Sequence, residues 1–263
     1  MTILDAYEYC DGNKTKAAEL LGMSRSAYRR AYDKAKGEPN SRVLVIGDTH
    51  APATHPDYVA FLRDIYNKYD CNRVVHIGDG VDHNAISFHE KDPSMPSPAD
   101  EFKEAYKQMQ EMYRAFPEVD YLTGNHSSLP ERKAKSIGIP EAYMKPFSEL
   151  WDVPRWKVHP RYTKLRIDGV QYRHGDQGKG GQQAALKNAQ AEFESVVQGH
   201  LHSQFGIWYH ANQNTLIWGM AVGCGVQHDH PAMNYGRIYA AKPILGCGVV
   251  LNGVEPRLEA MSL

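Results

Sequence analysis

Five short segments between residues 48 and 202 carry side chains that can bind metal ions. Each of them ends or follows a stretch that is typical of a β-strand. They are Asp48-Thr49-His50, Gly78-Asp79-Gly80-Val81-Asp82, Gly124-Asn125-His126, His174 and Gly199-His200-Leu201-His202. Their carboxylate, amide and imidazole groups can hold two divalent metal ions side by side, and a pair of such ions can cleave phosphate esters.

The types of ligand narrow the choice of metal. Hard oxygen atoms combined with imidazole nitrogens, and no thiolate, suit Mn, Zn, Fe or Ni, and among these we favour Mn. Two adjacent cations repel each other and need a shared carboxylate, for which Asp79 is the natural candidate. A single His or Asp after a strand is usually an ordinary polar residue, but five such segments in order are hard to obtain by chance.

The stretches between these segments alternate between strand and helix patterns. The expected strands are residues 42–47, 73–77, 119–123, 170–173 and 195–198, and the expected helices are residues 56–69, 100–116 and 182–194. The first strand is a continuous apolar run, which is typical of a strand buried on both faces. Such alternation predicts an α/β sheet, in which ligands gather at the carboxyl ends of the strands. Beyond residue 204 we expect strands and glycine-rich loops without a clear helix.

The N-terminal stretch differs from the rest of the chain. Thr15 can cap a helix that Gly22 breaks, and Ser24 can cap a second helix. Two helices joined by a tight turn form the helix-turn-helix layout. We therefore expect a small all-helical domain over residues 1–38, followed by the main domain over residues 39–263.

This N-terminal stretch resembles the helix-turn-helix of Fis-type bacterial DNA-binding regulators. The paired leucines and the turn glycine fall in register between Gly12 and Arg25. Because the start of the second helix usually meets bases and phosphates, the resemblance implies DNA contacts. The candidate DNA-binding residues are Lys14, Arg25, Arg29 and Arg30. The alternative is a solvated basic helix packed on the main domain.

The same resemblance suggests where the protein acts. A Fis-type helix-turn-helix is typical of a bacterial cell or a phage-infected host, so we expect a cytoplasmic protein whose partner is nucleic acid, with DNA favoured. A helix-turn-helix that reads a two-fold DNA site is usually dimeric, which would make the protein a homo-oligomer. The sequence shows no interface for one.

Taken together, the five segments resemble the pattern of the calcineurin-like metallophosphoesterases: Asp-x-His, Gly-Asp-x-x-Asp, Gly-Asn-His-Asp/Glu, His, and Gly-His-x-His. The resemblance covers roughly residues 42–202 and implies a four-layer sandwich, in which two β-sheets are flanked by helices. By position, it implies a first metal held by Asp48, His50 and His202, a second held by Asn125, His174 and His200, and Asp79 as the bridge. A hydroxide between the metals would attack phosphorus, and His126 would stabilise the transition state or protonate the leaving oxygen.

One position departs from the family pattern. The family usually has an acidic residue after Gly-Asn-His, which orients the histidine, whereas this chain has Ser127. The partner of His126 must therefore come from elsewhere or be missing. Asp82 would fix a ligand histidine or a loop, or it is an ordinary loop carboxylate.

Three further residues are candidates for substrate contacts. His83 and Asn84 follow the second segment and could line the site. Arg132 follows the third segment and could contact a phosphate backbone, although a solvated helix face is the more common meaning of such a basic run.

Composition excludes several classes of protein. The formal net charge of −1 excludes a globally basic nucleic-acid coat but leaves room for a local basic face. No apolar run is long enough to span a bilayer, so we expect no membrane partner. The 4 cysteines are widely separated and form no Cys-x-x-Cys pair, which favours reduced buried thiols over a structural zinc site.

Three functions remain open at this stage. The first is a two-metal phosphodiesterase tethered to DNA, hence a nuclease or a DNA-end processing enzyme. The second is a phosphomonoesterase or a phosphodiesterase for small or cyclic nucleotides. The third is a DNA-binding regulatory protein with a weakly active phosphoesterase scaffold. The complete ligand set argues against the third function. Ser127, which stands where the family usually has an acidic residue, keeps this function open.

Overall fold

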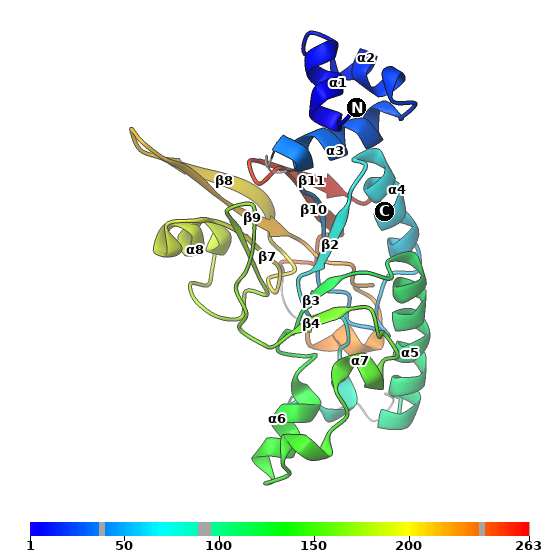
Figure 1. The fold of residues 1–263 in the computed structure, drawn as a ribbon. Coiled ribbons are helices and arrows are strands. Elements are labelled where there is room, and N and C mark those ends of the chain that lie inside the picture. The colour runs from blue at the N-terminus through cyan, green and yellow to red at the C-terminus, as the bar shows by residue number, and fades with distance from the viewer. Residues whose placement is uncertain (37–39, 89–95, 237–239, 263) are drawn as a thin grey trace.

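Two β-sheets face each other at the centre of the protein, in a computed structural model that describes residues 1–36, 40–88, 96–236 and 240–262 (Figure 1). The boundary expected between residues 38 and 39 lies outside these ranges. The six-stranded sheet has the order β11-β10-β1-β2-β3-β4, and the five-stranded sheet has the order β5-β6-β7-β9-β8. Both sheets are mixed. In the six-stranded sheet, antiparallel pairs join β1, β10 and β11 at one edge, and the pairs from β1 to β4 are parallel. In the five-stranded sheet, the central pairs are parallel and the pair at each edge is antiparallel.

The strands of the first sheet are β1 (Arg42–Ile46), β2 (Arg73–His76), β3 (Asp120–Leu122), β4 (Lys157–His159), β10 (Gly246–Leu251) and β11 (Glu255–Ala260). Those of the second are β5 (Leu165–Ile167), β6 (Val170–Arg173), β7 (Ser195–Gln198), β8 (Phe205–Ala211) and β9 (Leu216–Val222). The helices are α1 (Ile3–Tyr9), α2 (Lys14–Leu20), α3 (Arg25–Lys36), α4 (Tyr58–Lys68), α5 (Pro98–Ala115), α6 (Leu129–Ser136), α7 (Phe147–Leu150) and α8 (Ala184–Glu192). Short 3-10 turns are η1 (Asn84–Ile86), η2 (Glu141–Tyr143) and η3 (Pro231–Gly236).

Helices cover the outer faces of both sheets. α4 and α5 lie on one side of the molecule, and α8 packs on β7 and β9 on the other side (Figure 1). The order of layers is therefore helix, sheet, sheet, helix. This arrangement confirms the predicted four-layer sandwich.

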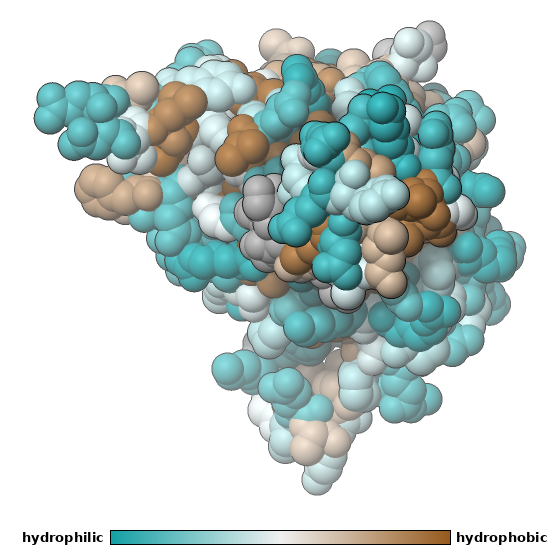
Figure 2. Space-filling view, turned by 45° about the horizontal axis from the view of Figure 1, so that its top comes forward, coloured by the Kyte–Doolittle hydropathy of each residue, from teal (hydrophilic) through white to brown (hydrophobic). Residues whose placement is uncertain are grey.

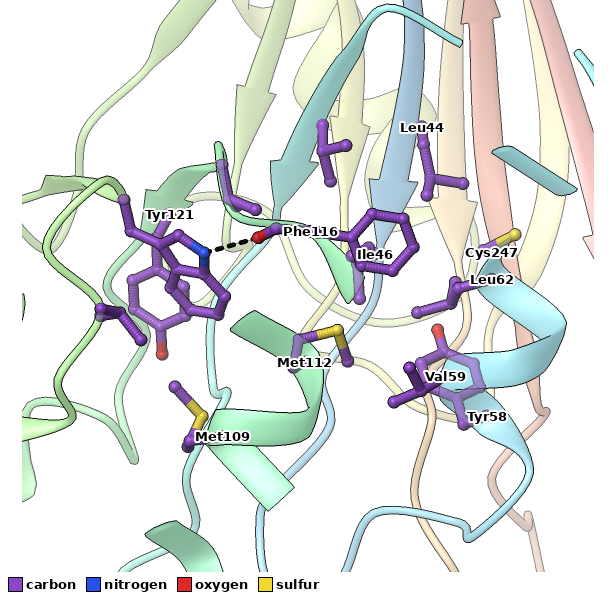
Figure 3. Packing of buried hydrophobic residues seen from close by; sticks show 14 of the residues in the cluster. Leu44, Ile46, Tyr58, Val59, Leu62, Met109, Met112, Phe116, Tyr121 and Cys247 are labelled. Carbon is purple, nitrogen blue, oxygen red and sulfur yellow. Dashed lines mark hydrogen bonds between the residues drawn. The ribbon is translucent and has the colours of Figure 1, made fainter. Parts of the chain in front are cut away.

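The first strand shows how the sequence specifies these layers. Side chains of a strand alternate between its faces, so a strand buried on both faces is apolar throughout. Val43 and Val45 point into the core between the two sheets, whereas Leu44 and Ile46 point into the core beneath α4 and α5. Figure 3 shows this second core, in which Leu44 and Ile46 lie near aromatic and sulfur-containing side chains from the helices.

The N-terminal helices form a small core of their own around Ala6, Ala17 and Tyr28. One detail of the prediction is wrong: the cap of α2 is Asn13 instead of Thr15. The Asn13 side chain accepts hydrogen bonds from the backbone N–H groups of Thr15 and Lys16, at 3.0 and 3.1 Å. Thr15 already lies inside the helix, and an asparagine side chain caps a helix at least as well as threonine.

These three helices lie at the end of the six-stranded sheet where β1 begins (Figure 1). Figure 2 turns this end of the molecule toward the viewer and shows hydrophilic side chains over much of the surface, with smaller hydrophobic areas between them. In the described part of the chain, no helix combines the length and the apolar composition needed to cross a bilayer.

Candidate metal centre

The segments predicted to bind metal meet at one edge of the two sheets because each directly follows a central strand. Parallel strands end at the same edge, so the loops that follow them are neighbours. β1 leads to Asp48, β2 to Asp79, β3 to Asn125, β6 to His174 and β7 to His200.

A first group of ligand atoms comes from Asp48, His50 and His202, which lie within 4.8 Å of one another. His202 Nε2 is 3.1 Å from Asp48 Oδ2, and His50 Nε2 is 3.9 Å from the same oxygen. The other ring nitrogen of His50, Nδ1, lies 2.7 Å from Asp82 Oδ1. Because a carboxylate only accepts, Nδ1 carries the proton and Nε2 presents its lone pair to the carboxylates.

A second group comes from Asp79, His174 and His200, whose ligand atoms also lie within 4.8 Å of one another. His174 Nδ1 donates to the backbone carbonyl of Ile77 at 3.1 Å, so Nε2 is the nitrogen that faces the other candidate ligands. That nitrogen is 3.1 Å from Asp79 Oδ2 and 3.0 Å from Asn125 Oδ1. Asp79 Oδ2 is also 4.0 Å from His50 Nε2, so it faces both groups.

One atom shows that these residues fit divalent cations. His50 Nε2 is buried and has no hydrogen-bond partner among the described residues. Leaving a buried polar atom unpaired is costly, and such atoms in native proteins need an explanation. A cation placed between His50, Asp48 and Asp79 would be the missing partner, and oxygen with imidazole ligands suits the metals expected from the sequence.

The carboxylates of the centre are in the form that binds metals. Burial raises the pKa of Asp48, but the positive charge of His174 and the hydrogen bond from His202 outweigh it and lower the pKa to about 2. The pKa of Asp79 is likewise held well below its usual range: burial raises it, and the charge and hydrogen bond of His174 overcome that effect. Both groups are therefore ionised at neutral pH, as metal ligation requires.

Three of the candidate ligands hold a backbone conformation that is uncommon outside glycine. The φ angles are +50° at His50, +45° at Asp79 and +65° at His200. Residues in such conformations cluster at functional sites, where the surrounding structure supports their strain.

Two glycines of the segments allow the carboxylates to lie against the backbone. A Cβ at Gly124 would be 2.2 Å from Asp79 Oδ1, and one at Gly199 would be 2.4 Å from Asp48 Oδ1. Both distances are far shorter than van der Waals contact, so any larger residue must displace the carboxylate.

We expect Gly124→Ala to lower phosphoesterase activity by about 10–100-fold, the range seen when the support of a metal ligand is removed. The displaced Asp79 would also weaken metal binding, which calorimetry with Mn measures. Gly180→Ala is the matched control, because a Cβ at Gly180 would meet nothing within 4 Å. Equal activity and metal affinity in both variants would contradict the role given to Gly124.

The orienting partner of His126 is Asp82. Its Oδ1 lies 3.0 Å from His126 Nδ1 and 2.7 Å from His50 Nδ1, and its backbone carbonyl oxygen also accepts from His126 Nδ1 at 3.0 Å, so one fully buried residue holds both imidazoles. Burial lowers the pKa of His126, but the hydrogen bond to Asp82 and the charges of Asp79 and Asp82 raise it to about 9. The carboxylate that the chain lacks after His126 is therefore supplied by the preceding segment.

Ser127 has a different part in the structure. Its hydroxyl lies 2.6 Å from the hydroxyl of Tyr121, which in turn accepts the backbone N–H of Gly80 at 2.9 Å. The Ser127 N–H donates to Asp79 Oδ1 at 3.1 Å. Tyr121 thus joins the loops of the second and third segments, and the sequence carries no signal for this, since a tyrosine in a buried strand is usually a core residue.

Comparison with known proteins agrees with this geometry. Residues 41–218 match the family described as calcineurin-like phosphoesterase. The chain belongs to this family. Residues 1–34 match the family described as bacterial regulatory protein, Fis family. No curated protein matches the chain at a significant level.

Several solved structures align with this calcineurin-like phosphoesterase. Vacuolar protein sorting 29 from Cryptosporidium parvum is 14% identical with a TM-score of 0.41, over 85% of this chain and 99% of the other. Nuclease MPE from Pseudomonas putida is 13% identical with a TM-score of 0.36, over 83% and 87%. The phosphoesterase YfcE from E. coli is 12% identical with a TM-score of 0.34, over 84% and 100%.

The predicted substrate residues lie around the centre in different ways. His83 lines a cavity beside it. The side chain of Asn84 donates to the backbone carbonyl of Ala232 at 3.0 Å and ties two loops together. Arg132 donates to the backbone carbonyl of Asn125 at 3.2 Å, so it supports the backbone of a candidate ligand.

The predicted DNA-binding residues lie elsewhere. Lys14, Arg25 and Arg29 line a cavity of about 770 Å³ together with Arg42 of β1 and Lys68 of α4. This cavity lies at the start of β1, whereas the candidate metal centre lies beyond its end. The side chain of Arg30 lies outside the described residues.

Proposed function

We propose that this calcineurin-like phosphoesterase is a phosphodiesterase that holds two divalent metal ions, with Mn favoured, and hydrolyses DNA. The observation that carries the proposal is that Asp79 faces both groups of ligands. The first ion would be held by Asp48, His50 and His202, the second by Asn125, His174 and His200, and both by Asp79. When bound, the two ions would lower the pKa of water toward neutrality and offset the charge that develops on the phosphoryl oxygens.

His126 is proposed to protonate the leaving oxygen. Its side chain is 13% exposed, so the ring reaches the surface of the centre, while Asp82 is fully buried beneath it. A donor for the leaving group needs this combination of access to the substrate and a fixed orientation. Asp82 is a positioning residue, because it touches His126 and His50 and is fully buried, out of reach of a substrate.

The N-terminal domain, residues 1–38, is proposed to tether DNA to the catalytic domain, residues 39–263. The match to the Fis family and the basic side chains Lys14, Arg25 and Arg29 support this. β1 separates these side chains from the metal centre, and its five residues span roughly 17 Å. Because duplex DNA rises about 3.4 Å per base pair, we expect cleavage at least several base pairs away from the tethered site.

The double substitution Arg25→Ala with Arg29→Ala tests the tether. We expect weaker DNA binding and a salt dependence of binding reduced by about 0.9 per lost phosphate contact, measured by fluorescence anisotropy across a salt series. Hydrolysis of bis-p-nitrophenyl phosphate should stay unchanged, because this small diester needs no tether.

The matched control replaces two lysines of α5, Lys103 and Lys107, which are exposed and pair with neighbouring carboxylates. It removes the same charge without touching α3. If both double variants cleave DNA and the small diester alike, the tether is wrong, and a phosphodiesterase for small nucleotides becomes the better account.

A further inference from the structure

An exposed aromatic ring lies against two cationic side chains next to the candidate metal centre. Phe88 is 63% exposed. Lys133 Nζ is 3.6 Å from the centre of its ring, and Arg132 Cζ is 5.5 Å from it. We propose that these three residues bind an unpaired nucleotide of a single-stranded segment of nucleic acid, with the base on Phe88 and the phosphate on Arg132 and Lys133.

Both sides of this patch come from loops of the candidate metal centre. Phe88 lies just beyond η1, in the loop that carries Asp82, and Arg132 and Lys133 lie on α6, which begins after His126. Arg132 also donates to the backbone carbonyl of Asn125. A strand bound here therefore lies next to the candidate ligands. Figure 1 shows α6 at the end of the molecule away from α1–α3, so this surface is separate from the proposed tether.

The aromatic side of the patch favours an unpaired base. Although a cation lies over the Phe88 ring, much of the residue remains open to solvent. Proteins that bind single strands stack bases on such rings, and this stacking tolerates any sequence because every base has a π-face. Inside a duplex the neighbouring base pairs cover these faces. Phe88 therefore selects a single-stranded segment and not a duplex.

The charged side of the patch favours a phosphate. In the described part of the chain neither Arg132 nor Lys133 pairs with a carboxylate, whereas Lys103 and Lys107 of α5 each do. A cation on an exposed aromatic ring gains little from it, so Lys133 can turn to a stronger partner. An acidic peptide could satisfy the two cations but would leave the ring uncovered. A nucleotide carries a phosphate and a π-face together.

The proposal deepens the proposed hydrolysis of DNA and rests on it only in that the bound strand is the substrate. Its test is binding of a short fluorescein-labelled oligothymidylate to the full-length protein in EDTA, measured by fluorescence anisotropy. The parent protein carries Arg25→Ala and Arg29→Ala, so that the N-terminal helices contribute little. We expect the parent to bind this single strand without any hydrolysis.

Phe88→Ala, made in this parent, tests the stacking. We expect it to weaken binding of the oligothymidylate by about 5–100-fold, as loss of one stacked base does. An abasic oligomer with the same number of phosphates should bind Phe88→Ala and the parent alike, because it offers no base. Phe193→Ala is the matched control, since Phe193 is 87% exposed and lies at the end of α8.

Lys133→Ala tests the phosphate contact. We expect the salt dependence of binding to fall by about 0.7, the value for one phosphate contact of a single strand. Lys135→Ala is the matched control on the same helix. Residues two apart on a helix do not face each other, so Lys135 points to a different side from Lys133 and its loss should leave the salt dependence unchanged.

Three results would overturn the proposal: no binding of the oligothymidylate by the parent, equal binding by Phe88→Ala and Phe193→Ala, or an equal loss for the abasic oligomer. The last result would give Phe88 a structural role without stacking. None of them depends on diester hydrolysis. Strand binding that requires Phe88 in a protein that hydrolyses no diester would instead refute the phosphodiesterase function and leave the strand site standing.

Discussion

Replacing Asp79 with asparagine is expected to lower the hydrolysis of bis-p-nitrophenyl phosphate by roughly a thousandfold or more. Asp79 Oδ2 lies 4.0 Å from His50 Nε2 and 3.1 Å from His174 Nε2, so it faces both ligand groups. Metal ions contribute several kcal/mol of charge stabilisation in the transition state, and each 1.36 kcal/mol is a factor of ten in rate. The measurement is the rate of diester hydrolysis with added Mn, expressed per metal ion bound to the protein in the same sample.

Asparagine is preferred to alanine because it keeps an oxygen that can accept the N–H groups of His126 and Ser127, now 2.8 and 3.1 Å from Asp79 Oδ1. Asp120→Asn is the control, since that carboxylate is also mostly buried but pairs with Arg73 and His159 away from the centre. A variant of Asp79 that folds and still hydrolyses the diester at near the wild-type rate would rule out its place as the bridge.

Replacing His126 with glutamine is expected to slow hydrolysis of a dinucleotide by about 10²–10⁴-fold, the usual contribution of general acid catalysis. The effect on bis-p-nitrophenyl phosphate should be much smaller, because p-nitrophenolate leaves as a stable anion without a proton. The two rates are measured side by side. Loss of substrate binding would slow the hydrolysis of both substrates alike, whereas loss of proton donation would slow mainly that of the dinucleotide.

Asp82→Asn is the companion variant. Asp82 orients both His126 and His50, so its loss should combine the leaving-group effect with a metal affinity weaker by about 10–100-fold. His126→Gln should leave metal affinity close to that of the wild type. If His126→Gln slows both substrates equally, His126 does not act as the proton donor.

Much of the candidate centre follows from local sequence because its side chains come just after central strands. The apolar run of β1 predicts a strand buried on both faces, and such a strand must lie inside a sheet with covered faces. Asp48, Asp79 and Asn125 follow neighbouring parallel strands, so the sheet itself brings their side chains close together.

The partner of His126 could not be predicted in this way. Asp82 meets the imidazole of His126 because two loops pack against each other in the fold. No pattern in the sequence specifies that packing. The same holds for Trp151, which follows α7 far along the chain and reaches the cavity of His83 only through the packing of α5 and α7. Contacts that depend on tertiary packing leave no periodic pattern in the sequence.

Competition between two neighbouring cap residues explains the smaller error in the N-terminal helices. Asn13 and Thr15 are both good caps and lie two residues apart, so the sequence admits two starts for α2. In the structure the cap is Asn13, whose side chain accepts hydrogen bonds from two backbone N–H groups at once. The position of α1–α3 at the start of β1 is again a matter of tertiary packing (Figure 1).

The most direct test of the central claim is diester hydrolysis by metal-free protein as Mn is added back in measured equivalents. Bound metal per chain and the rate of bis-p-nitrophenyl phosphate hydrolysis are followed in the same samples. A pair of sites joined by Asp79 predicts that activity rises until two ions are bound per chain and that p-nitrophenyl phosphate is the poorer substrate. Full activity with one ion, or no diester hydrolysis with two ions bound, would contradict the two-metal phosphodiesterase.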